Sequence, residues 1–114
     1  ATMVYEAVSN VKGAIALGYP FHPPGKPEKT RTEHLQTASK PLLIIQGERD
    51  TFGTKSEVED YKKRSVLSTE IECAYLDDGD HSFKPRKASG KTQEEHIVTA
   101  ATLTASFIEA HLNN

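Results

Sequence analysis

The sequence lacks tryptophan, has one cysteine, and contains no apolar run long enough to cross a bilayer. Because a single cysteine cannot form a disulfide within the chain, Cys73 is interpreted as a small core residue on a strand. No segment resembles a signal peptide. Unless a targeting segment precedes residue 1, we expect a cytoplasmic protein with no membrane partner.

The sequence also lacks a large excess of either charge, since it has 14 Lys and Arg and 16 Asp and Glu residues. The net charge is −2 and the pI about 6.2, which gives no field that would favour nucleic acid or an anionic membrane. With 114 residues the chain can form one structural unit and not two separate cores. Its apolar fraction of 36% is low for a self-contained domain and typical of part of a larger core.

Three segments have the pattern of β-strands. Residues 14–17 (AIAL) and 42–45 (LLII) are uniformly apolar, which favours strands buried on both faces of a parallel sheet. Residues 70–76 alternate, with Ile71, Cys73 and Tyr75 on one side, as in a strand near a sheet edge.

Three further segments have the pattern of helices. Residues 1–8 indicate a helix without a cap, as if the chain began inside the element. Thr54 has capping-box spacing to Glu57, with Val58, Tyr61 and Ser65 predicted to form a small buried face. Thr92 has the same spacing to Glu95 and opens a long amphipathic helix that reaches Leu112. Its predicted apolar stripe comprises Ile97, Ala100, Ala101, Thr104, Phe107 and Ile108.

The order of these elements is helix, strand, long loop, strand, helix, strand, helix. Such alternation predicts an α/β fold in which a parallel sheet of about three strands is flanked by helices. The proline-rich residues 19–40, with a short helical turn at 32–36, form a long excursion. Long ordered loops of this kind often serve as lids or binding loops, so we expect a lid-like loop here.

Two loops that follow predicted strands carry titratable groups. Asp50 lies in residues 47–53 (GERDTFG), and His81 lies in residues 78–83 (DGDHSF). The carboxyl ends of parallel strands share one sheet edge, so these side chains can meet there. A carboxylate that reaches an imidazole fixes its tautomer and stabilises the imidazolium formed when it accepts a proton.

The succession strand, G-E-R-D, helix, strand, G-D-H-S-F and final helix resembles the C-terminal part of the α/β-hydrolase fold. Residues 18–29 (GYPFHPPGKPEK), Arg31 and residues 33–35 (EHL) are similar to its dienelactone-hydrolase-like branch of predicted hydrolases. The resemblance implies that Asp50 is the acid and His81 the base of a catalytic triad, with residues 19–40 over the active site. It covers nearly the whole chain, which we interpret as a single partial domain, residues 1–114.

The family order of serine, acid and histidine places the nucleophile before the acid, in a G-x-S-x-G motif. That motif is absent from these residues, so we expect the serine and the oxyanion hole upstream of Ala1. The intact protein is then a serine hydrolase acting on a small-molecule acyl substrate, an ester or thioester, without a cofactor. This chain alone should be inactive, and should associate with its N-terminal half or with itself.

Two other functions stay open. The fold can persist without turnover as a protein-interaction module, in which Asp50 and His81 would be only a structural pair. An autonomous domain that binds a phosphorylated ligand is the third possibility, although no glycine-rich phosphate loop is present.

Several other residues invite a functional interpretation. His22 and Phe52 are expected on the substrate or lid side, although for His22 a structural role is favoured. Ser82 adjoins His81 but should point away from it. Asp77, Asp78 and Asp80 favour a solvated turn, and we expect no metal site. The basic residues Lys84, Arg86, Lys87 and Lys91 favour simple solvation, and no role is assigned to His34, His96 and His111.

Overall fold

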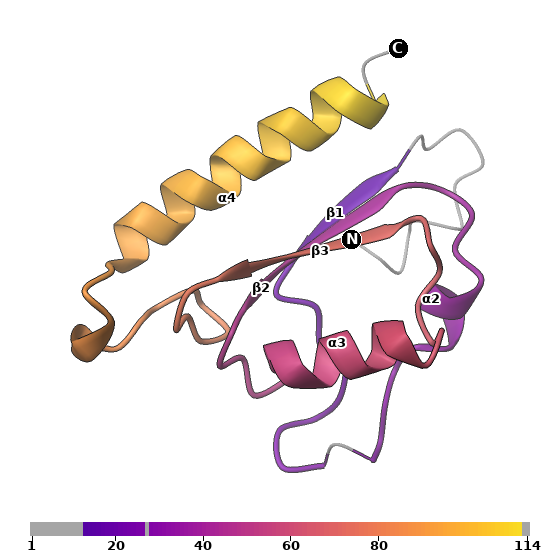
Figure 1. The fold of residues 1–114 in the computed structure, drawn as a ribbon, viewed down its shortest axis with the longest axis horizontal. Helices are drawn as coiled ribbons and strands as arrows, with labels where there is room; N and C mark the ends of the chain where they lie inside the picture. The colour runs from indigo at the N-terminus through magenta and orange to yellow at the C-terminus, as the bar shows by residue number, and fades with distance from the viewer. Residues whose placement is uncertain (1–12, 27, 113–114) are drawn as a thin grey trace.

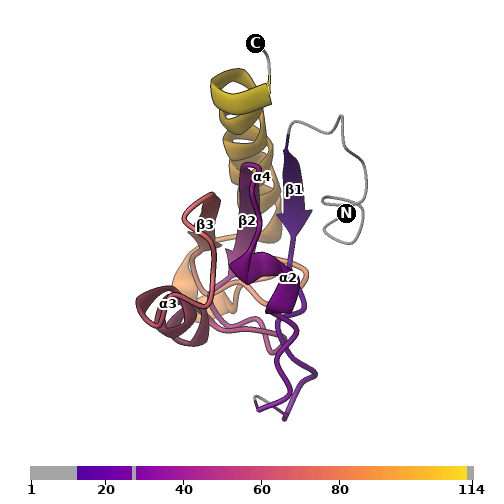
Figure 2. The same ribbon diagram turned by 90° about the vertical axis from the view of Figure 1, so that its right-hand side faces the viewer.

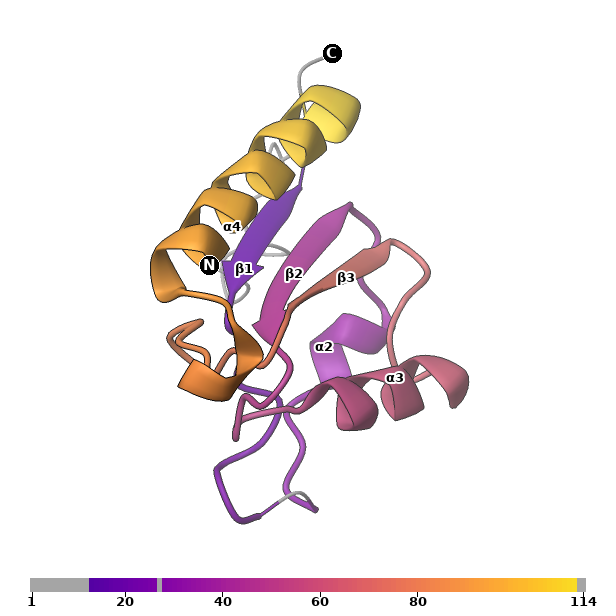
Figure 3. The same ribbon diagram turned by 60° about the vertical axis from the view of Figure 1, so that its left-hand side comes forward.

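The computed structural model describes residues 13–26 and 28–112, so the helix predicted for residues 1–8 lies outside the described part. Three strands, β1 (Ala14–Leu17), β2 (Leu42–Gly47) and β3 (Ile71–Leu76), form one sheet in the order β1-β2-β3. Both neighbouring pairs run parallel, as Figure 3 shows. The predicted parallel sheet is therefore confirmed, with the alternating strand β3 at one edge of it.

The central strand β2 is buried along its whole length. Its side chains alternate between two separate apolar clusters, with Leu42 and Ile44 in one and Leu43 and Ile45 in the other. Leucine and isoleucine suit this position because both faces of the strand are covered by other elements. The uniformly apolar run thus reflects a strand with no solvent side.

Helices cover both faces of the sheet. Figures 1 and 2 show α4 (Gln93–Phe107) on one face and α2 (Glu33–Gln36) with α3 (Lys55–Lys63) on the other. The predicted capping box opens α3, since the Thr54 side chain accepts from Glu57 N while the Glu57 side chain accepts from Thr54 N. A 3-10 turn, η1 (Lys87–Ser89), and a π turn, η2 (Ile108–Leu112), flank α4.

Two details of the helix predictions are wrong. Helix α3 ends at Lys63, and Ser65 has a φ of 58°, so it lies in the exposed turn beyond the helix instead of on its buried face. In α4, the described sheet covers Ala100 and Phe107 of the predicted stripe, whereas Ile97 and Ile108 remain 53% and 41% exposed. The stripe spans two adjacent helix faces, and only one of them packs on these strands.

Residues 19–40 leave the carboxyl end of β1 and return to β2 (Figure 1). Both ends of this segment belong to the core, because Tyr19, Phe21 and Leu35 are buried in the cluster under α3. The exposed part is the middle, of which residues 23–26 and 28–31 are described. The segment is therefore anchored on both sides of an exposed proline-containing turn.

The second face of α4 and the end of β1 form an apolar groove with a volume of about 420 Å³. Leu17, 59% exposed, contributes to it from β1. The other lining residues are Phe83, Ile97, Ala100, Ala101, Thr104, Ala105 and Ile108. No helix in the described part of the chain combines the length and the apolar character needed to cross a membrane.

Candidate functional site

Asp50 sits in a tight turn directly after β2. The turn is closed by backbone hydrogen bonds from Asp50 N to Gly47 O and from Gly53 N to Asp50 O, 3.1 and 3.0 Å long. The carboxylate is fully buried, and its Oδ1 accepts a hydrogen bond of 2.8 Å from Phe52 N. Because a buried carboxylate needs donors for its oxygens, this bond leaves Oδ2 to be satisfied by another group.

That group is the imidazole of His81, in the loop that follows β3. His81 Nδ1 lies 2.8 Å from Asp50 Oδ2. With the carboxylate as acceptor, Nδ1 carries the proton and Nε2 holds a lone pair. The His81 side chain is 44% exposed while that of Asp50 is 0% exposed. The structure therefore brings the two predicted residues together, with the carboxylate buried and the imidazole partly exposed.

Two glycines allow the loops to approach this closely. A methyl group at Gly47 would lie 2.2 Å from Asp80 O and 2.4 Å from Gly79 O, so any side chain there would collide with the backbone of the histidine loop. Gly18, with a φ of 74°, lies under the imidazole, and a methyl group there would be 3.2 Å from His81 Cε1. The strand ends thus pack directly against the loop that carries His81.

Arg49 and Arg86 hold the histidine loop from the other side. Arg49 N donates to Gly79 O, and its guanidinium Nε donates to Asp78 O. Hydrogen bonds from the Arg86 side chain and backbone, together with its charge, hold the pKa of Asp78 well below its usual range. Arg86 is exposed, as expected of a solvated residue, and it also forms an ion pair with Asp78 of this turn.

A second histidine–carboxylate pair lies beside the first. His22 Nε2 is 2.9 Å from Glu57 Oε1, and its Nδ1 is 2.8 Å from Pro23 O. Both ring nitrogens face acceptors, so only the doubly protonated imidazolium can donate both hydrogen bonds. Burial lowers the pKa of His22, but the bonds to Pro23 and Glu57 and the charge of Glu57 outweigh it and raise the pKa above 6.5.

His22 also links the proline-rich segment to the acid loop, because its backbone N donates to Phe52 O at 3.0 Å. Its imidazole is buried, which favours the structural interpretation; contact with a substrate stays a prediction. The half-buried Phe52 lies beside the exposed imidazole of His81, and the two ring centroids are 4.5 Å apart. Of these two predicted substrate-side residues, Phe52 is the one beside the imidazole.

The remaining predicted residues have structural surroundings. Asp80 Oδ1 accepts from Ser82 N and Lys84 N and so forms the turn around His81. Among the described residues no hydrogen bond joins Ser82 to His81, and no group of three or more histidine, cysteine or acidic side chains could hold a metal ion. Burial raises the pKa of Cys73 to about 11, which keeps its thiol neutral, as expected of a core cysteine.

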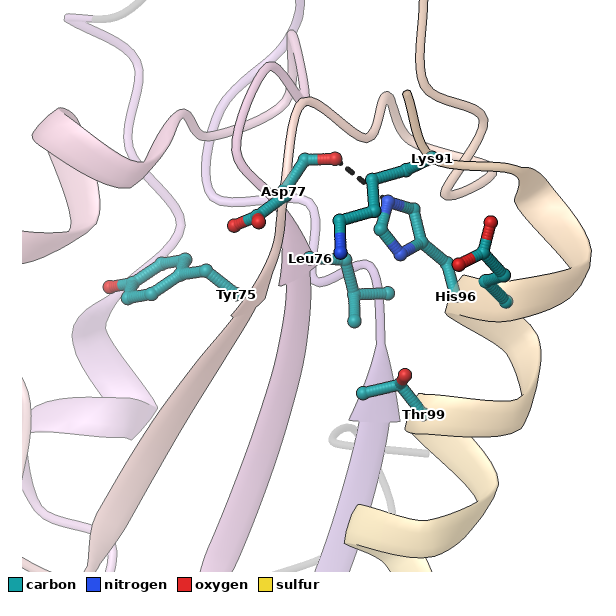
Figure 4. Close-up of a pocket in the computed structure, with 7 residues that line it drawn as sticks. Tyr75, Leu76, Asp77, Lys91, His96 and Thr99 are labelled. Carbon is teal, nitrogen blue, oxygen red and sulfur yellow. Dashed lines mark hydrogen bonds between the residues drawn. The ribbon is translucent and has the colours of Figure 1, made fainter. Parts of the chain in front are cut away.

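A separate polar pocket of about 250 Å³ lies between the end of β3 and the start of α4 (Figure 4). Its lining residues are Tyr75, Leu76, Asp77, Lys91, Glu95, His96 and Thr99. His96, to which no role was assigned, is buried, and its Nε2 donates to Asp77 O at 2.7 Å. The pocket lining includes neither Asp50 nor His81.

Sequence reasoning missed Gln46 and Glu57. Gln46 is a buried amide at the end of β2 whose three hydrogen bonds reach backbone atoms of two loops. One signal could have found it, since a polar residue that continues a fully buried apolar run must find partners inside the protein. Glu57 gave only a capping signal, and its bond to His22 spans 35 residues of sequence.

Comparison with known proteins identifies a family. The family model described as an alpha/beta hydrolase domain matches residues 1–109. No curated protein and no solved structure matches the chain. The family match covers most of the 114 residues, including both loops of the Asp50–His81 pair. The chain therefore belongs to the alpha/beta hydrolase domain family.

Proposed function

We propose that the intact protein is a serine hydrolase in which Asp50 is the acid and His81 the base of a Ser-Asp-His triad. The observation that carries this proposal is the bond of 2.8 Å from His81 Nδ1 to the buried Asp50 carboxylate, with the imidazole half-exposed. No described residue bonds His81 Nε2, which is the atom that would accept a proton. Family membership supports a hydrolase-type function.

In this reaction a serine hydroxyl attacks the carbonyl carbon of an ester or thioester and gives its proton to His81 Nε2. The imidazolium is stabilised by Asp50 and returns the proton to the leaving group as the acyl bond breaks. Water then releases the acid by the same steps. The serine and the oxyanion donors would come from the part of the protein that precedes residue 1, because G-x-S-x-G does not occur in these 114 residues.

We also propose a small acyl substrate, and we place the protein in a dienelactone-hydrolase-like branch on the resemblance of residues 18–29. Phe52 places an aromatic ring beside His81 and would form part of the acyl or leaving-group wall. The exposed middle of residues 19–40 would lie over the same edge as a lid-like loop. The proposed location is cytoplasmic, in keeping with a single cysteine, which cannot form a disulfide within the chain.

Labelling with a fluorophosphonate, which reacts with activated serines, tests this function in the intact protein. We expect one labelled serine outside residues 1–114, and loss of labelling in His81→Ala. The matched control is His111→Ala, because His111, in η2 beyond the C-terminal end of α4, also pairs with a carboxylate, 3.3 Å from Glu72. Absence of labelling, or labelling that His81→Ala leaves unchanged, would favour the non-catalytic interaction module instead.

We also propose that the N-terminal part of the intact protein covers the apolar groove beside β1. Leu17 and Ile97 are more than half exposed there, and the groove carries no charged lining residue. Residues 1–114 alone should then self-associate. By light scattering, the intact protein should have fewer chains per particle than residues 1–114 alone. A monodisperse, cooperatively unfolding monomer of residues 1–114 would contradict this.

A further inference from the structure

Gln46 is the one polar residue whose side chain continues the buried run of β2 between Ile45 and Gly47. Its carboxamide is fully buried, at 0% exposure. Burying an amide is costly unless its donors and acceptors are paired. Gln46 Oε1 accepts from Tyr19 N at 2.8 Å, while Nε2 donates to Tyr19 O at 3.1 Å and to Gly53 O at 2.9 Å.

These three bonds end on two different loops, and each loop supports one member of the Asp50–His81 pair. Tyr19 directly follows Gly18, the residue that lies under the His81 imidazole. Gly53 closes the turn of Asp50, because Gly53 N donates to Asp50 O at 3.0 Å. A single rigid side chain on the central strand thus joins the floor beneath the imidazole to the turn that holds the carboxylate.

A second connection between the same loops does not involve the sheet. It is the backbone bond from His22 N to Phe52 O, which joins two loop residues and uses no group of the sheet. Gln46, in contrast, projects from a strand that is paired with neighbours on both sides. Its bonds therefore fix both loops relative to the sheet as well as to each other.

We propose that Gln46 is a positioning residue for the proposed hydrolase: it holds the Asp50 turn and the support of His81 at the spacing that lets the pair act as one unit. Gln46 contacts no substrate in this scheme and acts only through the two loops. The inference rests on the proposed function for its kinetic consequence, although the geometry it concerns is measurable without turnover.

The test compares Gln46→Met with Gln93→Met in the intact protein. Methionine keeps the length of glutamine but removes the three hydrogen bonds that Gln46 makes with Tyr19 N, Tyr19 O and Gly53 O. Gln93 is the matched control, because its Nε2 also donates to a backbone oxygen of the histidine loop, Ser82 O at 2.9 Å, from an exposed position.

For Gln46→Met we expect kcat to fall about tenfold to a hundredfold while KM changes little, as when a reacting group is misplaced by a fraction of an ångström to an ångström. The NMR signal of the hydrogen-bonded Nδ1 proton of His81 should shift or broaden. Gln93→Met should alter neither measurement. A folded Gln46→Met protein with unchanged kcat and an unchanged His81 signal would overturn the inference.

The NMR signal separates this inference from the proposed function. A His81 signal that responds to Gln46→Met in a protein without hydrolase activity would support the positioning role and count against the hydrolase. If Gln46→Met does not fold, hydrogen exchange in the unaltered protein gives the test. The Tyr19 amide should then exchange as slowly as the Gly18 amide, which bonds Ile45 O, and fast exchange at Tyr19 would overturn the inference.

Discussion

The two histidine–carboxylate pairs of this protein have nearly equal lengths and opposite burial. In Asp50–His81 the carboxylate is buried and the imidazole is 44% exposed, whereas in His22–Glu57 the imidazole is 4% and the carboxylate 29% exposed. In the first pair no described residue bonds Nε2, and the second pair uses both ring nitrogens. The comparison indicates that a histidine is available for proton transfer when its imidazole is the exposed member of the pair. The length of the hydrogen bond alone does not decide this.

The largest expected effect concerns the buried carboxylate of the first pair. Asp50→Asn should lower kcat of the intact enzyme by about ten-thousand-fold, because an amide in place of the carboxylate favours the wrong imidazole tautomer and no longer stabilises the imidazolium. Single-turnover kinetics with an activated ester would measure it. A loss of less than tenfold would mean that the pair does not act as acid and base.

The next effect concerns stability and should separate the two pairs. His22→Leu leaves Pro23 O and Glu57 without their charged donor, so we expect a loss of about 1.5 to 3 kcal/mol in the free energy of unfolding. Turnover of the protein that remains folded should change little. His81→Leu is the comparison variant: turnover should be lost, and stability should also fall because the buried Asp50 Oδ2 loses its donor. Equal effects of the two variants on both measurements would remove the distinction.

The effect of His22→Leu should depend on pH in a defined direction. The folded-state pKa of His22 is raised above 6.5, so its stabilising contribution is complete below about pH 6.5 and is lost as the pH rises through the raised value. Burial raises the pKa of Glu57, but bonds from His22 and Thr54 lower it further, below 4.5, so the contribution of Glu57 is lost as the pH falls through that lowered value.

Urea denaturation of the unaltered protein and of His22→Leu, at about pH 6 and about pH 9, measures this dependence. The stability difference should be larger at the lower pH. A difference that grows with pH would contradict a protonated His22. The carboxylates that face this imidazole are Glu57 and, at longer range, Asp50, and both favour its charged form.

The smallest effect is expected at Ser82. Its side chain forms no hydrogen bond with His81 among the described contacts, and the residue is exposed. Ser82→Ala should change the free energy of unfolding by no more than about 0.5 kcal/mol and leave fluorophosphonate labelling intact. Loss of labelling in this variant would identify Ser82 as the nucleophile and overturn the proposed origin of the serine outside this chain.

Much of the fold could be predicted because the local signals agreed with the tertiary structure. The runs AIAL and LLII became β1 and β2, and Thr54 and Thr92 each cap the helix they were predicted to open. The face of α4 that packs on the sheet was harder to predict. A stripe that includes both Ala100 and Ile97 does not indicate which of two adjacent faces makes the contact.

The site was predictable to a similar extent. Asp50 and His81 could be placed at one sheet edge because parallel strands share that edge, and the structure brings them within hydrogen-bond distance. The partners that hold them were not visible in the sequence, since the bonds of Gln46 to Tyr19 and of Glu57 to His22 span 27 and 35 residues. Such pairings depend on the packing of loops, which leaves no local periodicity.

The close contact of Gly18 and Gly47 with the histidine loop has a consequence for large-scale mutagenesis. In a screen that scores activity alone, substitutions at these two glycines should be as damaging as those at Asp50 and His81, since an added carbon would displace the loop that carries the imidazole. A map of intolerant positions would therefore include glycines that have no chemical role in the reaction, together with the side chains proposed to carry it out. Scoring abundance together with activity would show which substitutions act through the backbone, because a side chain at Gly47 would collide with the histidine loop, whereas the half-exposed His81 can be shortened without a collision.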